Sequence, residues 1–546
     1  MRTLLIATTT TLLASACSSG PAPQLDPPVL KVTSPARSLI QTGAGVITVT
    51  GTVAPNDHGT PVTSVQVNGV AATVGADGGF VAQVQVQPGA TLLHTEAVDS
   101  AGGKASDTRS VEAGELRAPG SNIDSAVTAA ISANAFAKIS DAAATLLKTT
   151  DLMPMIAPMN PMVHTGDSNG PDCLYAQLYV DGFKMTDAKL SMVPVNGGLQ
   201  FSAELDGLDV PGHMNYAVAC INGSNTTEVK AQSVVIGGTL LVTPDGKGAF
   251  TTTLDSPVVN ITGLDITASG VPGTILSMLP IDSAIEYIAP KAAELFMGPM
   301  MNSALAGLGG PKQLNLLGMT IDVAVSPSNV SFDTTGGLVS LDMMMLIEGT
   351  ENSKGFTFTD NGMPTFNPGQ GMQLAVADDL ANEVLSQLVA TGKMSMVVPQ
   401  QGGVFDAAKL EPTSPPMISA DPSDGTMRLV LPDMMMTFTN AGTPVAKAAL
   451  NASVELKIAP VNNGYGVAIQ LGTPTINIDI LDDIPNLTHL TNDDLSQAVE
   501  LGMNGQIAQI SALLGGIPLP SMAGLQMTDL SVGGTDGYVM IAGALK

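Results

Sequence analysis

Apolar positions near the end of the chain recur at helical spacing. Between positions 493 and 514 they are Leu495, Val499, Met503, Ile507, Ile510 and Leu514. Steps of three and four place these residues on one face of an α-helix, so we predict an amphipathic helix here. Gly515-Gly516 ends the helix, and Ile517-Pro518-Leu519-Pro520 predicts a stiff extended exit. Two strands are predicted to follow, Leu525–Val532 and Tyr538–Leu545, with Gly533-Gly534 as their turn.

The same order of elements occurs once before. Residues 282–308 have apolar positions at roughly helical spacing, and Gly309-Gly310-Pro311 ends this second predicted helix. Strands are predicted over Leu316–Val325 and Leu338–Ile347, with Gly336-Gly337 between them. The sequence therefore predicts a repeated unit that ends in a helix, a Gly-Pro exit and a pair of strands.

Each repeat also begins with a predicted helix. Over residues 121–147, the apolar residues follow one another at steps of four: Ile123, Val127, Ile131, Ala135 and Ile139. Over residues 378–389, Leu380, Val384 and Leu388 do the same, and Gly392 ends the run. We therefore predict two related modules in tandem, 116–365 and 366–546.

Several predicted strands alternate between apolar and polar residues. In one strand Leu341, Met343 and Met345 share a face, and in another Met434, Met436 and Phe438 do so. Alternation of this kind predicts sheets with one dry and one wet face. A long sheet whose dry face wraps an amphipathic helix forms a tube, and any part that the helix leaves open is an apolar cavity.

A separate domain precedes the two modules. Residues 18–28 are rich in Pro and Ser and predict a linker, whereas 29–115 contain strand-sized runs bounded by turns such as Asn68-Gly69 and Asp77-Gly78-Gly79. This spacing predicts an all-β sandwich. The segment resembles bacterial immunoglobulin-like domains, which implies a spacer on an exported protein.

The long helix, the exit at 517–520 and the final strand pair resemble the C-terminal end of the bactericidal/permeability-increasing protein family. That family belongs to the tubular lipid-binding (TULIP) superfamily. The resemblance implies an α+β fold with two tandem barrels, each an antiparallel sheet wrapped around long amphipathic helices and joined through a shared central sheet. It also implies non-covalent binding and transfer of lipids in apolar tunnels, without enzyme activity.

The charge balance narrows the choice of partners. The 546-residue chain has a formal net charge of −27 and no cluster of four Lys or Arg residues, so we expect no nucleic-acid binding. Lipopolysaccharide-neutralising members of the resembled family carry a basic tip, so the acidic composition also argues against endotoxin as the ligand. We expect a phospholipid or another acyl-chain amphiphile.

The first residues predict export. An apolar run from Leu4 to Leu13 is followed by Ala14-Ser15-Ala16-Cys17, which is typical of a secretory signal. It resembles a bacterial lipoprotein signal and implies a signal peptide over 1–17, with Cys17 lipidated and anchored to a membrane. Ser18 implies the outer membrane of a Gram-negative bacterium. An ordinary signal cut after Ala16 is the alternative.

Two other cysteines remain, Cys173 and Cys220. In an exported chain such a pair predicts a disulfide. The resemblance implies the same, because the resembled family has one disulfide in its N-terminal barrel.

The predicted lipid-binding residues combine helix stripes with the dry strand faces. They are Ile131, Ile139, Leu341, Met343, Met345, Met434, Met436, Phe438, Val499 and Ile507. Flexible Met side chains adapt to acyl chains, but an ordinary packed core uses the same residues. The alternative function is therefore a structural or adhesive surface protein with solid barrels.

A serine hydrolase is the remaining alternative. Gly166-Asp167-Ser168-Asn169-Gly170 matches the G-x-S-x-G string, but that nucleophile needs a helix leaving the turn, and a strand is predicted instead. None of the five His residues falls in a recognisable triad or metal spacing. We therefore expect no enzyme activity, no metal and no cofactor.

Overall fold

The computed structural model describes most of the chain. It covers residues 26–546 except 168–169, 171–173, 272–290, 292–293, 295–297, 299–312, 317–318, 361, 400–405, 421–426, 462–465, 483–516, 520, 523 and 536. Three helical residues, Lys291, Glu294 and Gly298, are described within the helix predicted over 282–308. The helix predicted over 493–514 lies wholly outside the described residues, and so do Val499 and Ile507.

The N-terminal domain is a β-sandwich of two sheets. Its strands are β1 (Val29–Ser34), β2 (Leu39–Gln41), β3 (Gly45–Ala54), β4 (Val62–Val67), β5 (Val70–Ala71), β6 (Thr73–Val74), β7 (Gly79–Val86), β8 (Gly89–Asp99) and β9 (Lys104–Ala113). One sheet has the order β1-β3-β7-β6 and the other β2-β9-β8-β4-β5. A core of its own lies between them, with Phe80 and Leu93 each 1% exposed.

A central sheet of eight strands joins the two halves of the remaining chain. Its strands are β11 (Ile123–Ser132), β19 (Gln313–Leu316), β20 (Met319–Asp333), β21 (Gly336–Ile347), β23 (Met372–Ala377), β32 (Ser521–Met522), β33 (Leu525–Thr535) and β34 (Tyr538–Leu545). Their order is β19-β20-β21-β11-β23-β34-β33-β32. The shared central sheet implied by the family resemblance is therefore present.

The middle of this sheet is an antiparallel pair with approximate two-fold symmetry. Strands β11 and β23 pair with Thr128 opposite Ala375 and Ala129 opposite Leu374. Outward from this pair, β21, β20 and β19 on one side correspond to β34, β33 and β32 on the other. The two halves of the chain thus enter the sheet in the same way.

Two further sheets curve away from the central sheet in opposite directions. The N-terminal half-barrel contains β12 (Val163–Asp167), β13 (Leu174–Val180), β14 (Asp187–Val195), β15 (Gly198–Val218), β16 (Ile221–Pro244), β17 (Phe250–Thr262) and β18 (Asp265–Ala268). The C-terminal half-barrel contains β24 (Met396–Pro399), β25 (Ala407–Glu411), β26 (Met417–Ala420), β27 (Met427–Asn440), β28 (Thr443–Val461), β29 (Gly466–Leu471), β30 (Thr475–Asp482) and β31 (Ile517–Pro518).

Strand order is the same in both half-barrels. The first runs β12-β13-β15-β16-β17, and the second runs β24-β25-β27-β28-β29 before β31. Off these paths, β14 pairs with β15 as β26 pairs with β27, and β18 pairs with β16 as β30 pairs with β28. The repeated order predicted from the sequence is thus visible in the pairing, although closed barrels around long helices are not found in the described part of the chain.

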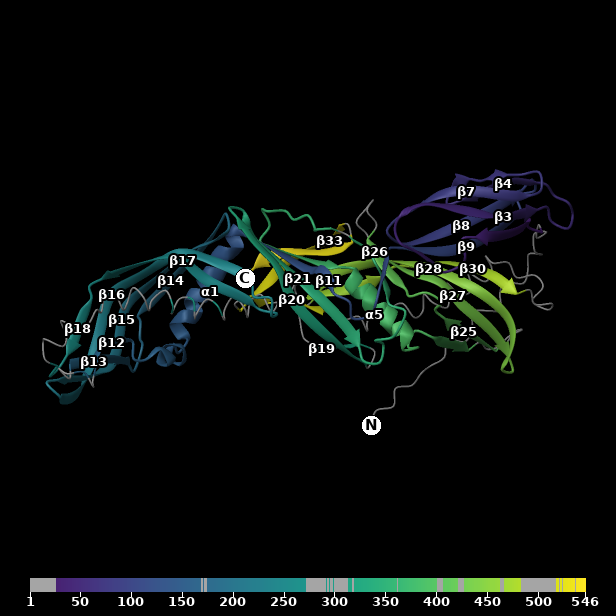
Figure 1. Cartoon of the computed structure of the whole chain (residues 1–546). Coiled ribbons are helices and arrows are strands. Elements are labelled where there is room, and N and C mark those ends of the chain that lie inside the picture. The colour runs from purple at the N-terminus through teal and green to yellow at the C-terminus, as the bar shows by residue number, and fades with distance from the viewer. Residues whose placement is uncertain are drawn as a thin grey trace, which may run out of the picture.

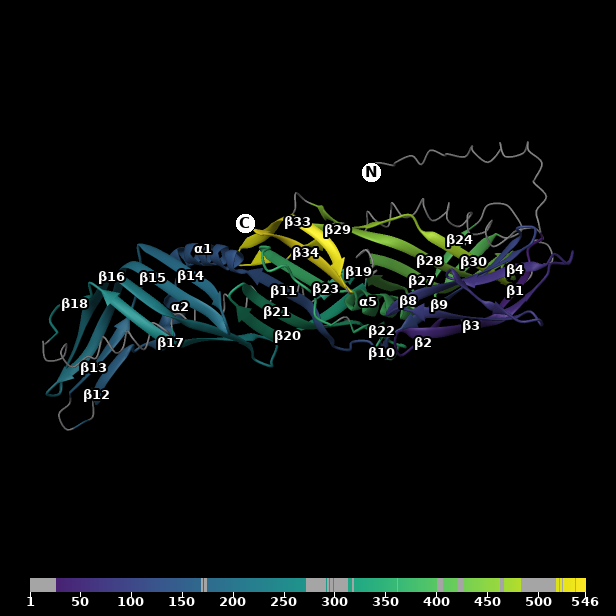
Figure 2. The same ribbon diagram turned by 90° about the horizontal axis from the view of Figure 1, so that it is seen from above.

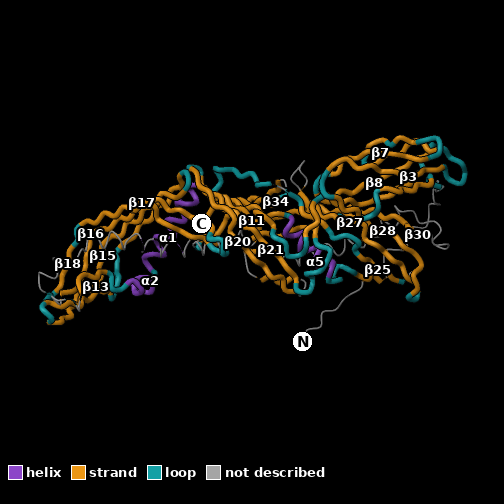
Figure 3. The backbone as a smooth tube through the Cα atoms, viewed as in Figure 1, coloured by secondary structure: helices purple, strands orange, loops and turns teal. Residues whose placement is uncertain are grey.

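Each half has one longer helix among its described residues, and in the N-terminal half a short helix α2 (Met153–Ile156) and a 3-10 turn (Ala157–Met159) follow it. Helix α1 spans Ala133–Thr149 and follows β11, whereas α5 spans Asp379–Ala390 and follows β23. Figure 3 shows how little helix accompanies the strands. None of the described helices is long and apolar enough to cross a membrane.

The helix predicted over 121–147 is wrong in its first half, because Ile123–Ser132 is strand β11. A step of four residues is also twice the two-residue repeat of a strand, so Ile123, Val127 and Ile131 share a face in either structure. Helix α1 begins only after Ser132, whose hydroxyl oxygen accepts a hydrogen bond from the Ala135 N–H at 3.3 Å.

Both predicted glycine turns are also misplaced. Gly336-Gly337 opens strand β21, and Gly533-Gly534 lies inside β33. The turn between β20 and β21 lies at residues 334–335, before the two glycines. The Asp333 side chain closes it by accepting hydrogen bonds from the N–H groups of Thr335 and Gly336. Before β34, the residue in the left-handed region is Gly537, with φ of 84°.

The whole molecule is elongated, with the central sheet between the two half-barrels (Figure 1). The N-terminal sandwich lies beside the C-terminal half-barrel in both views (Figures 1 and 2). Strand β10 (Glu115–Arg117) then pairs with β22 (Phe356–Phe358) before the chain enters β11. This domain packs directly on the C-terminal sheet through contacts described below, and its role as a spacer stays a prediction.

Candidate functional site

Five of the predicted lining residues lie in the largest hydrophobic core. Ile131 is in β11, Ile139 is in α1, and Leu341, Met343 and Met345 are in β21. All five are at most 9% exposed, whereas Met344 between the two methionines is 37% exposed. The alternation of β21 thus turns Leu341, Met343 and Met345 into this core, which also contains residues of α1 and α5.

Three other predicted residues lie in a different core. Met434, Met436 and Phe438 are on β27 and pack with residues of β25, β28 and β30, including Leu410, Leu450 and Ile478. The structure therefore divides the predicted lining between two separate clusters. Among the described pockets, only Ile131 of the predicted set contributes to a wall. A cavity role for the other residues stays a prediction.

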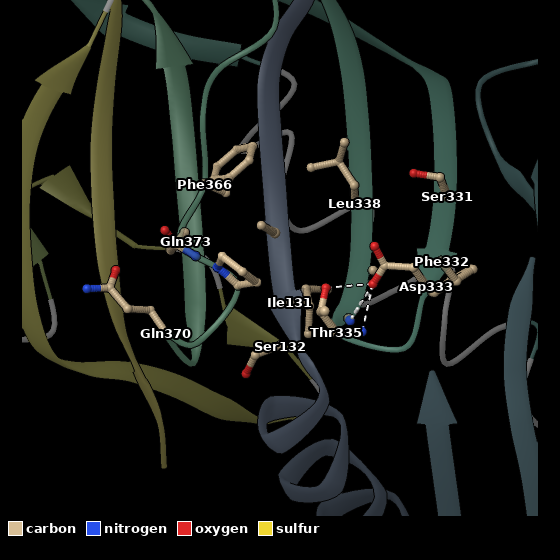
Figure 4. Close-up of a pocket in the computed structure, with 14 residues that line it drawn as sticks. Ile131, Ser132, Ser331, Phe332, Asp333, Thr335, Leu338, Phe366, Gln370 and Gln373 are labelled. Carbon is tan, nitrogen blue, oxygen red and sulfur yellow. Dashed lines mark hydrogen bonds between the residues drawn. The ribbon is translucent and has the colours of Figure 1, made fainter. Parts of the chain in front are cut away.

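One pocket lies where the central sheet meets the start of α1. It has a volume of about 420 Å³ and is lined from β11, β20, β21, β23 and the loop 366–370 (Figure 4). Its apolar walls come from Ile131, Phe332, Leu338 and Phe366. Leu338 and Phe366 lie on either side of β11, because β21 and β23 pair with its two edges. Its size falls in the usual range for small-molecule sites.

Glycines make room at the base of this pocket. A Cβ on Gly337 would lie 2.7 Å from the Phe332 ring and 3.2 Å from the Phe136 ring. The two rings themselves stand 6.0 Å apart at 58°, an edge-to-face-like arrangement that aromatic pairs favour. Gly337 therefore lets β21 pass close to an aromatic pair that links α1 to the pocket wall.

A buried amide holds the loop that borders the pocket. Gln373, 4% exposed on β23, donates from Nε2 to the Asn367 carbonyl at 2.6 Å. Its Oε1 accepts from the Asn367 N–H at 2.9 Å. This two-way clamp fixes Phe366 and Gln370 at the pocket edge. The sequence signal for this residue is a single polar Gln inside the otherwise apolar run Met372–Ala377.

The rim of the pocket is polar and contains no cation among its described residues. Ser132, Ser331, Thr335 and Gln370 offer hydroxyl and amide groups, and Asp333 is the one acid. Hydrogen bonds from the Thr335 hydroxyl and N–H lower the pKa of Asp333, so it is ionised at neutral pH. The rim therefore favours an uncharged or positively charged group over an anion.

A second pocket lies on the outer side of α1. It has a volume of about 510 Å³, between the helix residues 134–145 and the end of β34. Leu525, Ala544 and Leu545 supply apolar surface, and Lys138, Asp141 and Lys546 supply charge. Lys546 already pairs with Asp529 at 2.6 Å. The two pockets thus flank the first turns of α1 with different electrostatic character.

Helix α5 carries a different kind of cluster, with buried polar side chains. Glu383 accepts from the N–H groups of Gly120 at 2.7 Å and Met345 at 3.2 Å. Gln387 accepts from the Ile347 N–H at 2.6 Å and donates to the Met345 carbonyl at 2.8 Å. Pairing of β11 with β21 ends at Met343, so the backbone groups of Met345 and Ile347 have no partner on β11. Side chains of α5 provide the hydrogen bonds that a neighbouring strand would otherwise make.

Burial raises the pKa of Glu383 to about 8 and that of Asp379 to about 7. Perturbed carboxyls often mark active sites. Here both acids are occupied by backbone N–H groups, since Asp379 accepts from Thr359 at 3.1 Å. We therefore interpret the α5 cluster as a clamp on loops and strand ends. Among the described residues, no group of three His, Cys, Asp or Glu side chains could hold a metal ion.

The remaining predicted site residues are only partly covered. Cys220 follows strand β15 and is disulfide-bonded, but Cys173 and Cys17 lie outside the described residues. The Cys173–Cys220 pairing and the lipidation of Cys17 therefore stay predictions. Ser168 also lies outside the described residues, and Gly166 and Asp167 before it belong to strand β12.

Comparisons with known proteins give three findings. Residues 28–114 match the family described as glucodextranase, domain B, which covers only the N-terminal sandwich. A search of curated proteins gives no match. Two solved structures are similar over most of the chain: a lipopolysaccharide binding protein, at 15% identity and a TM-score of 0.39, and P47 of Clostridium botulinum E1, at 9% and 0.28.

The first similarity covers 78% of this chain and 99% of the other, and the second covers 79% and 100%. Both TM-scores are below 0.5, so the fold described here rests on the strand pairing of the chain itself. That pairing gives a sandwich followed by two half-barrels of the same strand order.

Proposed function

We propose that this protein binds an amphipathic lipid non-covalently, with the acyl chain in the pocket between β11, β21 and the loop 366–370. The observation that carries the proposal is the division within this pocket between apolar walls and a polar rim. An amphiphile has the same division, with an apolar chain and a polar head. Each methylene group moved from water into an apolar environment contributes about 0.8 kcal/mol before ordering costs.

The rim narrows the choice of head group. Its hydroxyls, its amide and the ionised Asp333 can accept from or donate to an uncharged or zwitterionic head group. A purely anionic head group would face Asp333 without a cation from this rim. This agrees with the expectation, drawn from the acidic composition, that endotoxin is not the ligand. A phospholipid or another acyl-chain amphiphile remains the proposed ligand class.

A matched pair of variants tests the proposal. Leu338 and Leu346 are both partly buried on β21, but only Leu338 lines the pocket. Binding of a fluorescent phosphatidylcholine analogue should weaken about ten-fold in Leu338→Asn and stay unchanged in Leu346→Asn, because only the first variant removes apolar wall. Mass spectrometry of lipid co-purified with the wild-type protein provides an independent readout.

Two outcomes would overturn the proposal. The wild-type protein could carry no lipid and bind none of the analogue, which would favour the structural or adhesive alternative with solid cores. Equal loss in both variants would show that the effect comes from stability rather than from the pocket. We further propose, from the sequence alone, that Cys17 anchors the chain to the outer membrane and that transfer of lipid takes place at the cell envelope.

A further inference from the structure

A buried ionic cluster joins the N-terminal sandwich to the C-terminal half-barrel. Arg37, in the loop between β1 and β2, contacts Asp433 on β27 at 2.9 Å and Asp479 on β30 at 3.1 Å. It also contacts Asp107 on β9 at 3.3 Å. The side chains of Asp433 and Asp479 are only 1% and 5% exposed, so this contact excludes water from the two acids.

The same acids cover an open edge of strand β9. The Thr108 N–H donates to Asp479 at 2.9 Å, and the Ser110 N–H donates to Asp433 at 3.0 Å. The Thr108 carbonyl accepts from Arg37 at 2.6 Å and from Asn451 at 2.8 Å. Unpaired edge groups normally need a strand or water. Side chains of the C-terminal sheet take that place here.

The outer face of the C-terminal sheet is built for this contact. Asp433 interrupts the register of β27 and has a φ of 37°, a conformation that L-residues rarely adopt. Asn451 on the neighbouring strand holds it in place, accepting from the Asp433 N–H at 2.8 Å and donating to its carboxylate at 2.9 Å. A polar side chain held in a strained conformation and buried only under the sandwich indicates a specific docking site.

Charges in the cluster do not balance. Three acids, Asp107, Asp433 and Asp479, meet two guanidinium groups, because Arg109 also binds Asp107 at 2.9 Å. One oxygen of Asp479 is buried without a partner among the described residues. Leaving an ionised carboxylate buried and under-partnered is costly, whereas a protonated carboxyl is not. Binding of one proton by the cluster would therefore balance its charge.

We propose that the Arg37–Asp433–Asp479 cluster is a proton-operated latch, which holds the sandwich on the C-terminal half-barrel while a proton is bound and loosens when that proton leaves. Within the latch, Arg37 remains the cation and Asp433 remains the permanent anion. Asp479 takes and releases the proton. Loosening uncovers the N–H groups of Thr108 and Ser110.

The directions in which the surroundings shift the pKa values of Asp479 and Asp433 support these roles. Burial, and then the charge of Asp107, raises the pKa of Asp479 to about 7, although Arg37 opposes this. Burial also acts to raise the pKa of Asp433, but the Ser110 N–H, Asn451 and Arg37 together hold it below its ordinary value. Asp479 is thus the acid that changes charge near neutral pH.

The sign of the pH effect follows from these directions. A raised pKa in the docked state means that Asp479 favours docking fully below pH about 4, and that this contribution is lost as the pH rises through about 7. Asp433 has a lowered pKa, so its ionised form favours docking. That contribution is lost only when the pH falls below the ordinary pKa of an aspartate. Between about pH 5.5 and 8.5, the docking equilibrium constant should therefore fall roughly thirty-fold.

Other charged or titratable groups face the latch from the elements packed around it. They are His94 on β8 and Asp107, Arg109 and Glu112 on β9. His94 bonds the Thr108 hydroxyl at 2.8 Å. Burial raises the pKa of Glu112, which therefore acts in the same direction as Asp479.

Hydrogen exchange of the full chain tests the latch. The reporters are the Thr108 and Ser110 amides, with amides of β3 and β7 in the far sheet as the reference. In the wild-type protein, the protection of the reporters relative to the reference should fall about thirty-fold between about pH 5.5 and 8.5, after correction for intrinsic exchange. In Asp479→Asn, which cannot ionise, it should stay high and nearly constant.

Two control variants assign the proton. His94→Gln and Glu112→Gln should each keep most of the wild-type pH dependence. A wild-type protein with constant protection would overturn the latch, and this measurement needs no variant to fold. The proposal also fails if Asp479→Asn keeps the full wild-type dependence, or if His94→Gln or Glu112→Gln abolishes it.

Discussion

Helices α1 and α5 occupy corresponding places in the two halves but bury opposite kinds of side chain. Each follows one strand of the symmetric pair β11–β23. Helix α1 buries Phe136, Ile139 and Leu147, whereas α5 buries Asn382, Glu383 and Gln387 beside its apolar residues. One helix therefore works as an apolar wall near the pockets, and the other as a polar clamp on loops and strand ends. The two helices therefore have the same place in the topology but stabilise their surroundings by different interactions.

The difference follows the surroundings of each helix. Helix α1 lies against β14 and the aromatic pair at the pocket, where apolar contacts are available. Helix α5 lies where β21 continues past β11 and where the chain arrives from the sandwich, so free backbone groups need partners. Of the two half-barrels, the C-terminal one contacts the sandwich among the described residues, and the polar side chains of α5 lie on that side of the molecule.

The largest expected effect is at the apolar wall. Phe136 is 2% exposed and packs on Phe332. Phe136→Ala should lower the free energy of unfolding by about 4 kcal/mol, because it removes buried apolar area and leaves a cavity. Chemical denaturation measures this loss, and Phe136→Leu is the conservative control with a smaller loss. A loss below about 1 kcal/mol in Phe136→Ala would mean that α1 is not a packed wall.

The polar clamp should tolerate the loss of one side chain somewhat better. Gln387→Leu keeps the volume but leaves the Ile347 N–H and the Met345 carbonyl without their partner. Each unsatisfied buried group costs about 1–3 kcal/mol, so we expect a loss of about 3 kcal/mol in a denaturation experiment. Gln387→Glu keeps an acceptor for the Ile347 N–H, and protonation at low pH gives it an O–H that can donate to the Met345 carbonyl, so it should recover part of the loss as the pH is lowered. A neutral Gln387→Leu would contradict the clamp.

The smallest expected effect is a pH dependence of stability at α5. Because the pKa of Glu383 is raised to about 8, its contribution to stability is present at low pH and is lost as the pH rises through about 8. The free energy of unfolding should fall by roughly 2 kcal/mol between pH 6 and pH 8 through this group. Glu383→Gln should remove that part of the slope. An unchanged slope would assign the effect to other acids.

Sequence patterns predicted the repeated order of elements. They failed where the spacing of apolar residues fits both a helix and a strand. The final strand Tyr538–Leu545 and the helix starting near Asp379 were predicted within a residue. Ile123, Val127 and Ile131 were placed on a helix because steps of four fit both a helix and a strand. The Ala-rich sequence after Ser132, rather than the apolar spacing, marks where α1 begins.

The candidate site was less accessible from the sequence, because its walls come from distant segments. Phe332, Leu338 and Phe366 meet only after β11 has paired with β21 and β23. The docking of the sandwich depends on Arg37 and Asp479, which are separated by most of the chain. No local pattern reports such a pair. Buried polar residues inside apolar strands, such as Gln373 and Asn451, were the usable signals.

The symmetric pairing of β11 with β23 also sets the order in which the molecule can assemble. Strand β11 finds one neighbour about 250 residues later in the chain, and β23 finds one of its own only in β34, at the very end. Contacts over such separations form slowly, because long loops must close first. The two halves therefore cannot finish folding one after the other. Until the final strand arrives, β23 presents a bare edge on which another chain could pair.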